Sequence, residues 1–395
     1  MRDLPVEEAR ARMLALATAL PTETVALDAG LGRVLAEPVS ALRDQPPFDS
    51  SAMDGWAVRG AGETFTIVGE SAAGHGYAGA LGEGQAVRIF TGAPVPAGAD
   101  RVVIQEEAVR DGDIVRVPAA TGGATHVRRR GRDFQAGARL LEPGLRLDPW
   151  RLALAAAAGR AGLKVARRPR VIILSTGEEI VPAGSEPGPE QIFDSGGPAL
   201  AALIVRWGGE AIRLAATGDD ADAIAEAVAA AGGDLIVTVG GASVGDHDLV
   251  KPALARLGLT LAVETVRLRP GKPTWFGTLG DGRRVLGLPG NPASALVCAE
   301  LFLRPLLSAM LGADPTLTLA SARLAAPLPA NGGREHWARA QLAWADGGLI
   351  ATAMTDQDSS LVATFANAHG LVRQPVGAPA MAAGDVVEVL LLDRL

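Results

Sequence analysis

Three glycines and two aspartates occur within nine positions, directly after an apolar run typical of a buried strand. The run reads DLIVTV, and the segment that follows it, residues 240–248, reads GGASVGDHD. Glycine lets a ligand approach the backbone closely, because no side chain intervenes. Carboxylates repel a phosphate unless a divalent cation lies between them or they orient a proton. The combination therefore predicts an anionic ligand bound together with a metal ion.

Three other apolar runs also end in polar segments. These segments are STGEE at 175–179, TGDD at 217–220 and GLPGNPAS at 287–294. In a parallel α/β sheet the carboxyl ends of the strands meet at one edge, and ligands bind there. One glycine-rich strand end usually only reverses the chain, whereas four on one sheet favour a binding site. None of the four matches a P-loop or a dinucleotide-binding fingerprint.

Two further features add groups that bind anions. Asn291 is typical of a helix N-cap and Pro292 of a first helical position, and a helix that begins there offers free backbone N–H groups to an anion. The turn RPGKP at 269–273 holds Lys272 between a glycine and a proline. Taken alone, Lys272 is better explained as a surface lysine in a turn. Beside four polar strand ends, this explanation and a role in binding an anion are equally good, and the whole set predicts an anion and metal site.

A second group of polar residues lies in the first third of the chain. PPFDSSAMDGWAV at 46–58 carries Asp54, and RIFTGAPVPAGAD at 88–100 carries Thr91 at a strand end. Asp-Gly and Gly-Ala-Pro form turns readily, which explains part of each pattern. A polar run of this length between aromatic residues is unusual for a turn alone. These residues are therefore a second candidate for a site.

The expected secondary structure changes several times along the chain. Apolar residues at helical spacing predict one helix at 4–20 and another at 148–161. From 40 to about 135, short β-like runs separated by glycine and proline predict a small all-β module. From residue 169 strands and helices alternate, which predicts an α/β domain with a parallel sheet covered by helices on both faces. The tail at 315–395 again indicates β structure.

Composition limits the class of protein. The chain has 395 residues, of which 48% are hydrophobic and 21% charged, and its formal net charge is −7. This length predicts roughly two to four domains, and the acidic balance argues against nucleic acid as a partner. The lone Cys298 excludes an internal disulfide and is expected in the core. Neither a signal peptide nor a membrane span is predicted, so we expect a cytoplasmic protein with no membrane partner.

Six motifs, in this order and at this spacing, resemble those of the MoeA family of molybdopterin molybdenumtransferases, which includes the E domain of gephyrin. The motifs are SAMDGWAV, RIFTGAPVP, STGEE, GGASVGDHD, RPGKP and GLPGNPAS. The resemblance implies a role in molybdenum cofactor biosynthesis. The implied reaction is the insertion of molybdate into adenylylated molybdopterin with Mg²⁺, which releases AMP and molybdenum cofactor.

The resemblance also implies an elongated homodimer of four-domain subunits. Residues 1–39 and 136–168 form the split N-terminal domain of this scheme, and residues 40–135 form the small β module between them. Residues 169–312 correspond to the α/β molybdopterin-binding domain and residues 313–395 to a C-terminal β-barrel. In this family the site lies between the α/β domain of one subunit and the β module of the other. Such a composite site accounts for two separate polar groups in one chain.

Positions that match the family motifs are expected to carry the family's functions. The expected catalytic residues are Asp54, Thr91, Asp133, Glu179, Asp219 and Asp248. The expected Mg²⁺ ligands are Asp219, Asp248 and Glu179. The expected substrate-binding residues are Ser175, Thr176, Gly240, Gly241, Ser243, Gly245, Arg269, Lys272, Pro289, Gly290, Asn291, Pro292, Ser359 and Ser360. For Asp54, a role as general base and a role in positioning water or molybdate stay equally open.

Some positions depart from the family pattern. Arg269 stands where a lysine is common, which keeps the charge but changes the geometry. The segment that contains Ser359 and Ser360 matches the family less closely. The histidines show no metal-ligand spacing. We expect His247 near the site and the other four at the surface, namely His75, His126, His336 and His369.

Two alternative functions compete with this one. The α/β domain also resembles molybdopterin adenylyltransferase, which makes the nucleotide instead of consuming it, but the β module and the tail argue against that enzyme. Gephyrin uses the same fold as a scaffold for receptor tails. A pure scaffold has no need of carboxylates, whereas Asp54, Asp219 and Asp248 are all present. The family suggests the adenylyltransferase and the recipient molybdoenzymes as further protein partners.

Overall fold

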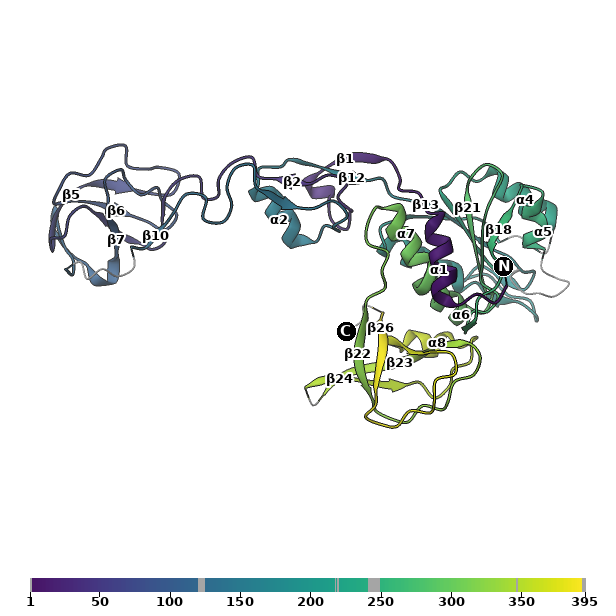
Figure 1. Cartoon of the computed structure of the whole chain (residues 1–395). Helices are drawn as coiled ribbons and strands as arrows, with labels where there is room; N and C mark the ends of the chain where they lie inside the picture. Colours follow the sequence, from purple (N-terminus) through teal and green to yellow (C-terminus); the bar gives the residue numbers. More distant parts are fainter. Residues whose placement is uncertain are drawn as a thin grey trace.

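The computed structural model describes residues 2–119, 125–216, 218, 220–240, 249–345 and 347–392. Figure 1 shows an extended molecule. A β module that contains β5, β6 and β7 lies at one end. A slender linking region around α2 follows, and the α/β domain and the C-terminal β structure lie together at the other end.

The β module is a six-stranded sheet in the order β7-β4-β6-β5-β9-β8. Its strands are β4 (Gly55–Val58), β5 (Thr64–Ser71), β6 (Gln85–Ile89), β7 (Arg101–Ile104), β8 (Val109–Asp111) and β9 (Ile114–Arg116), with a 3-10 turn η2 (Gln105–Glu107). A short pair, β3 (Ser50–Ser51) with β10 (Val127–Arg128), lies beside it. Trp56, Val58 and Phe65 point into a small buried core, as alternating residues of half-buried strands do. The predicted all-β module is confirmed.

The linking region consists of two passes of the chain, one before and one after the β module. β1 (Thr22–Ala26) pairs antiparallel with β12 (Gly162–Ala166), and β2 (Val39–Ser40) pairs with β11 (Arg139–Leu141). The 3-10 turn η1 (Leu27–Ala29) and helix α2 (Pro149–Ala157) complete it. Asp148 caps α2 by accepting a hydrogen bond from the backbone N–H of Arg151 at 2.8 Å. The β module is therefore an insertion between paired strands.

The first helix, α1 (Val6–Ala15), packs on the α/β domain. Its buried Val6, Ala9 and Met13 belong to the same apolar cluster as the strands of that domain. The helix is shorter than the predicted 4–20, because the chain beyond it turns toward the linking region, and the backbone N–H of Leu20 donates to the carbonyl of Met310 at 2.9 Å. The domain boundaries proposed from the sequence stay a prediction.

The α/β domain is built on a six-stranded sheet in the order β16-β13-β17-β21-β20-β18. Its strands are β13 (Arg170–Ser175), β16 (Glu210–Arg213), β17 (Leu235–Val239), β18 (Thr260–Val263), β20 (Trp275–Thr278) and β21 (Arg284–Leu288), and a separate parallel pair is formed by β14 (Ile180–Val181) and β15 (Ile192–Phe193). The first four strands in the order are parallel, β20 runs antiparallel to them, and β18 pairs antiparallel with β20 and so again runs in the direction of the first four. The sheet is thus mixed and not wholly parallel, because a short hairpin joins β20 to β21 without a crossover helix.

Helices cover both faces of this sheet, as predicted. They include α3 (Gly196–Arg206), α4 (Ala221–Ala230) and α5 (Val250–Ala255). Val171 and Ile173 of β13 pack into the apolar cluster that contains α3, whereas Ile172 and Leu174 pack into the one that contains α4 and α5. Successive side chains of a strand point to opposite faces. The near-continuous apolar run of β13 therefore fills two separate cores.

A continuous helical segment follows β21 and packs in the same apolar cluster as α1 and α3. It consists of α6 (Pro292–Cys298), the π-helical turn η3 (Ala299–Leu303) and α7 (Arg304–Met310). Within the described ranges it is the one helix whose length and composition would allow it to cross a membrane, but 83% of its most apolar window is buried inside the fold. It is therefore a core helix.

The C-terminal residues form a β-barrel, as predicted. Its strands are β22 (Leu319–Leu324), β23 (Glu335–Ala345), β24 (Gly348–Ala353), β25 (Gly370–Gln374) and β26 (Val386–Leu391), and helix α8 (Val362–Ala366) lies between β24 and β25. β23 pairs with both β24 and β25, which closes the ring. A strand from the α/β segment, β19 (Leu268–Arg269), joins β23 and places Arg269 opposite His336. The pairing of a strand from the α/β segment with a strand of the barrel was not predicted.

Candidate substrate-binding site

The four polar segments predicted to meet follow four neighbouring strands. β16, β13, β17 and β21 are adjacent and parallel, so their carboxyl ends lie at one edge of the sheet. Ligands of open α/β sheets bind at this edge. Of the predicted residues, Asp219, Gly241, Ser243, Gly245 and Asp248, together with His247, lie outside the described residues.

Gly240 is needed by the packing of the chain itself. Its φ is +94°, and a Cβ added there would lie 2.6 Å from the carbonyl oxygen of Thr176. Gly290 is also close, since its own Cβ would lie 3.5 Å from the Cα of Gly240. The buried Thr176 donates its backbone N–H to Val239 at 2.9 Å. The loops after β13, β17 and β21 therefore touch one another, and the glycine there makes room for backbone.

Gly240→Ala is expected to reduce the free energy of unfolding by about 2 kcal/mol, because the residue combines a left-handed φ with a backbone contact that cannot move. The measurement is chemical denaturation of the purified variant. Gly232→Ala is the matched control, since a Cβ at Gly232 meets nothing within 4 Å. Equal stability of the two variants would contradict this reading of Gly240.

Two carboxylates at this edge have different surroundings. Asp194, which the sequence reasoning missed, is about nine-tenths buried. It accepts hydrogen bonds from Gly197 N–H at 2.8 Å and Ser175 Oγ at 3.4 Å, and it pairs with Arg213 at 3.0 Å. The DSGGP motif at 194–198, at the start of α3, could have identified Asp194 from the sequence. Glu179 is exposed, and its carboxylate lies over Gly177, so that a Cβ on Gly177 would be 2.6 Å from Oε2.

The described residues supply one of the three predicted Mg²⁺ ligands, Glu179. They contain no group of three or more His, Cys, Asp or Glu side chains that could hold a metal ion. The other two carboxylates belong to segments that follow β16 and β17, the two strands adjacent to β13. Oxygen ligands of this kind suit Mg²⁺. The metal site therefore stays a prediction.

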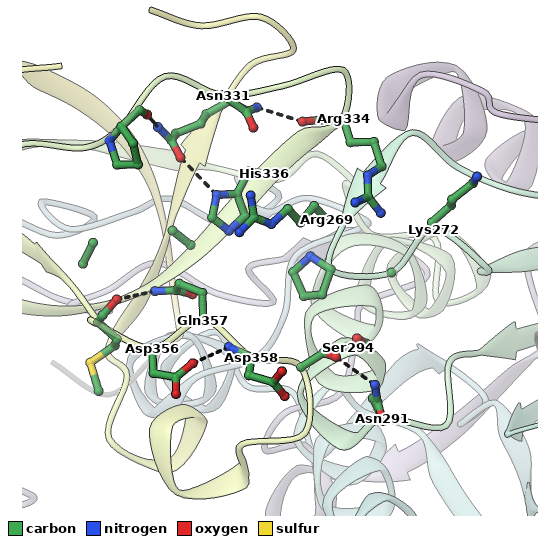
Figure 2. Close-up of a pocket in the computed structure, with 18 of the residues that line it drawn as sticks. Arg269, Lys272, Asn291, Ser294, Asn331, Arg334, His336, Asp356, Gln357 and Asp358 are labelled. Atoms are coloured by element: carbon green, nitrogen blue, oxygen red, sulfur yellow. Dashed lines mark hydrogen bonds between the residues drawn. The ribbon is translucent and has the colours of Figure 1, made fainter. Parts of the chain in front are cut away.

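A cavity of about 730 Å³ lies between the α/β domain and the C-terminal barrel. Figure 2 shows Lys272 and Asn291 on one side of it, Asn331 and Arg334 on another, and Asp356 and Asp358 below. Five predicted substrate-binding residues line it, namely Arg269, Lys272, Pro289, Asn291 and Ser359. The remaining predicted substrate-binding residues that the structure describes do not line the cavity, namely Ser175, Thr176, Gly240, Gly290, Pro292 and Ser360. The structure thus divides the predicted set between the cavity and the edge of the sheet.

Cations and carboxylates both line this cavity. Arg269, Lys272 and Arg334 supply positive charge, and Lys272 Nζ lies 3.8 Å from Asp3 Oδ1 while its side chain stays half-exposed. The carboxylate of Asp358 accepts two hydrogen bonds from Ser360, which lower its pKa. Sequence reasoning missed Asn331, Arg334, His336, Asp356, Gln357 and Asp358, because nothing in their local pattern indicates that the barrel faces the RPGKP turn.

Ser359 fixes the barrel to the start of α6. Asn291 occupies the N-cap position as predicted, but its side chain makes no cap hydrogen bond and instead donates to Ser359 Oγ at 2.8 Å. The backbone N–H of Ala293 donates to the carbonyl of Ser359 at 3.1 Å. The helix start therefore offers fewer free N–H groups to an anion than expected, because the barrel satisfies one of them.

A buried arginine holds the loop that carries Ser359. Arg339 is fully buried, and both its backbone N–H and its Nε donate to Gln357 Oε1, at 3.0 and 3.1 Å. Its Nη1 donates to the carbonyl of Asp358 at 2.9 Å, and Gln357 Nε2 donates back to the Arg339 carbonyl at 2.9 Å. Residues 354–359 form one wall of the cavity, so Arg339 sets the position of that wall.

The RPGKP turn is held from behind by a buried threonine and cysteine. Thr274 Oγ1 donates to the carbonyl of Gly271 at 2.8 Å and lies 3.1 Å from Cys298 Sγ. A Cβ on Gly271 would lie 2.3 Å from that sulfur, so only glycine fits. Burial raises the pKa of the Cys298 thiol to about 12. Cys298 is a core residue, as predicted.

Two residues of the second predicted group, in the β module, are in contact. The carboxylate of Asp54 accepts hydrogen bonds from the backbone N–H of Thr91 at 2.6 Å and from its hydroxyl at 2.8 Å. These two bonds hold the pKa of Asp54 below its ordinary value, the backbone bond contributing most. Asp133 is exposed in the loop after β10, and within the described part of the chain it makes no hydrogen bond to either residue.

Thr91→Val is expected to raise the pKa of Asp54 toward its ordinary value, because the hydroxyl bond to the carboxylate is lost while the backbone bond remains. The carboxylate would then protonate at higher pH than in the wild type. The measurement is a ¹³C NMR titration of the Asp54 carboxyl carbon. Thr91→Ser is the control and should keep the wild-type titration, since it retains the hydroxyl.

His336 does not lie at the surface, which corrects the prediction. Its side chain is 7% exposed and lines the cavity, and Nδ1 lies 3.0 Å from Gln374 Oε1. Burial lowers its pKa from the ordinary value. The pairing of β19 with β23, which no local pattern predicts, brings His336 under Arg269.

Fold and site together define a multidomain protein in which an α/β domain, with polar loops at the carboxyl edge of its sheet, is combined with a β module and a C-terminal β-barrel. Residues 4–159 match the family described as MoeA N-terminal region (domain I and II), residues 172–309 the probable molybdopterin binding domain, and residues 321–392 the MoeA C-terminal region (domain IV). These three matches follow one another in the order expected from the motifs.

Full-length relatives agree with these matches. The chain is 40% identical to the molybdopterin molybdenumtransferase of Nostoc sp. over 72% of this chain and 69% of that protein. It is 32% identical to the enzyme of the same name from Bacillus subtilis, over 98% and 94%. A crystal structure of the MoeA protein from Pyrococcus horikosii superimposes with a TM-score of 0.83 over 100% of both chains, at 32% identity. The chain belongs to the MoeA family of molybdopterin molybdenumtransferases, enzymes of molybdenum cofactor biosynthesis.

Proposed function

We propose that this chain inserts molybdate into adenylylated molybdopterin in a Mg²⁺-dependent reaction that releases AMP and molybdenum cofactor. The observation that carries the proposal is the cavity beside the carboxyl edge of the sheet, lined by Arg269, Lys272 and Arg334. Molybdate and the pyrophosphate and dithiolene of the nucleotide are all anionic. Fixed cations at a partly enclosed site stabilise such groups and the charge that develops when the phosphoanhydride breaks.

Each part of the site has a distinct task in this proposal. The cations of the cavity bind oxyanion groups, and the loop around Ser359 closes the cavity against α6 through Asn291. Asp54, kept ionised by Thr91, orients water or molybdate. The dithiolene sulfurs of the substrate ligate molybdenum, so no protein thiol is required, which agrees with the buried and protonated Cys298.

Mg²⁺ is proposed to bind Glu179, Asp219 and Asp248. Their segments follow three adjacent parallel strands, and carboxylate oxygens are its preferred ligands. A bound Mg²⁺ would neutralise phosphate charge at this edge.

A homodimer with composite sites is part of the proposal. Within one chain the β module that carries Asp54 lies at the opposite end of the molecule from the α/β domain (Figure 1). The linking region separates the two, so a second chain must supply Asp54 if both parts act on one substrate. We further propose a cytoplasmic location, delivery of the nucleotide by the adenylyltransferase, and transfer of the product to molybdoenzymes.

The test is to mix purified protein, adenylylated molybdopterin, Mg²⁺ and molybdate, and to measure AMP. AMP release that depends on both molybdate and Mg²⁺ supports the proposal. Binding of the nucleotide without AMP release would indicate a scaffold. Formation of the nucleotide from molybdopterin and ATP would indicate an adenylyltransferase, although the complete β module and barrel do not favour that function.

A further inference from the structure

His336 is a buried titratable group on the wall of the cavity, and the proposed chemistry leaves it unused. It is 7% exposed and sits on β23 opposite Arg269 of β19. Figure 2 shows its ring beside the Arg269 side chain, below Asn331. A buried histidine in a ligand cavity must present either a hydrogen-bond donor or an acceptor, and which one it presents affects what binds.

The hydrogen bonds around the ring determine its tautomer. Gln374 Nε2 lies 3.1 Å from the carbonyl of Pro329, which can only accept, so the amide nitrogen must face Pro329. Gln374 Oε1 therefore faces His336 Nδ1 at 3.0 Å, and Nδ1 must carry a proton. Among the described residues, Nδ1 is the ring nitrogen with a hydrogen-bond partner. Neutral His336 thus has an unprotonated Nε2, which is an acceptor.

Burial and the charges around His336 favour the neutral ring. Burial contributes most, and Arg269 on the paired strand, Arg339 on the same strand and Arg334 directly before it also disfavour a further positive charge, whereas the hydrogen bond to Gln374 opposes this effect. Gln374 on β25 is uncharged. Across the cavity the loop after β24 carries Asp356 and Asp358, and the turn after β19 carries Lys272. At neutral pH the neutral ring of His336 therefore places a hydrogen-bond acceptor close to Arg269 and Arg334, two of the cations that line the cavity.

We propose that His336 determines which tetrahedral oxyanions this cavity accepts. Neutral His336 accepts a hydrogen bond from an oxyanion that retains a proton and repels the lone pairs of one that has none, such as molybdate. Protonated His336 donates to the deprotonated oxyanion from the same position. The inference rests on the proposed function of the cavity and adds a residue that determines its specificity.

The expected pH dependence follows from linkage. A bound deprotonated oxyanion stabilises the imidazolium and so raises the pKa of His336 relative to the free protein. Affinity for molybdate is then highest below the free pKa, which lies below its ordinary value, and it falls as pH rises toward the bound pKa. One charge-assisted hydrogen bond corresponds to roughly a tenfold change or more in affinity. Inorganic phosphate retains at least one proton across the pH range in which histidine ordinarily titrates. The affinity of the cavity for phosphate should therefore change less with pH than its affinity for molybdate.

The experiment measures binding of dilute molybdate and of inorganic phosphate by calorimetry, in steps from about pH 5.5 to 8.5 across the ordinary histidine range. Wild-type protein is compared with His336→Gln and with His75→Gln, an exposed histidine of the β module. We expect the wild type and His75→Gln to lose molybdate affinity roughly tenfold with rising pH. His336→Gln should bind molybdate with little pH dependence, and the wild-type His336 resonances should titrate at higher pH when molybdate is present.

Two results would overturn the proposal: the same molybdate pH dependence in wild type and His336→Gln, or no molybdate binding at any pH. AMP release is measured in parallel at saturating molybdate. If the wild type releases AMP normally and His336→Gln does not alter the pH dependence of molybdate binding, only the role of His336 is contradicted. Absence of AMP release by the wild type contradicts the proposed function instead.

Discussion

A mixture of Asp54→Ala and Lys272→Ala chains is expected to recover about a quarter of wild-type AMP release, although each variant alone loses about 100-fold or more. The reason is the proposed composite site. Random pairing makes about half of the dimers hybrid, and in each hybrid one of two sites contains neither substitution. The measurement is AMP release after the two variants are mixed, dissociated and reassociated.

A matched control uses two substitutions in the same module. Asp54→Ala and Thr91→Ala both alter the β-module half of the site, where Thr91 donates two hydrogen bonds to Asp54. Every site of that hybrid carries one of the two substitutions, so no recovery beyond the parents is expected. Differently tagged chains verify that hybrids form. Hybrids of Asp54→Ala with Lys272→Ala that form and stay inactive would show that each site is built within one chain.

Arg339→Met is expected to reduce the free energy of unfolding by about 3 kcal/mol, because the fully buried side chain of Arg339 loses its hydrogen bonds to Gln357 Oε1 and to the carbonyl of Asp358. Arg339 is fully buried and makes three hydrogen bonds to these two residues; the backbone one survives the substitution. Loss of the other two should also release the loop at 354–359, which forms one wall of the cavity. We therefore expect roughly a tenfold higher KM for molybdate, with a smaller change in kcat.

Arg323→Met is the control for loss of an arginine from the same barrel. Arg323 is exposed on β22 and makes one hydrogen bond, to Gly384 at 3.2 Å. Its substitution should change stability by about 0.5 kcal/mol or less. The measurements are the free energy of unfolding by chemical denaturation and the KM for molybdate by steady-state kinetics, each compared between Arg339→Met and Arg323→Met. If Arg339→Met keeps both stability and KM, the loop is held by its contacts with Asn291 and Ala293 instead.

Local sequence determined the elements and their order. The apolar run of β13 alternates into two cores, and the glycine and proline breaks mark the short strands of the β module. Such patterns depend on residues close together in the chain, whose periodicity already records which faces are buried. For the same reason the strand-end segments could be located in advance, because parallel neighbours deliver their carboxyl ends to one edge.

Only the tertiary structure decided how these pieces combine into a cavity. β19 leaves the α/β segment to pair with β23, and this single pairing brings Arg269 against His336. No local feature of either strand identifies the other as its partner, because strand pairing depends on packing and on cross-strand neighbours. The sequence alone therefore supported a surface position for His336.

The polar residues buried at the site were decided in the same way. Arg339 and Asp194 are charged, and charged residues are expected at the surface unless a partner compensates them. Their partners, Gln357 with Asp358 and Arg213 with Ser175, lie on other elements and become neighbours only after folding. By contrast, the Asp54 and Thr91 motifs were recognisable from the sequence, because each lies in a turn whose local chemistry is distinctive. The sequence thus determined which residues could do chemistry, and long-range packing decided which of them meet.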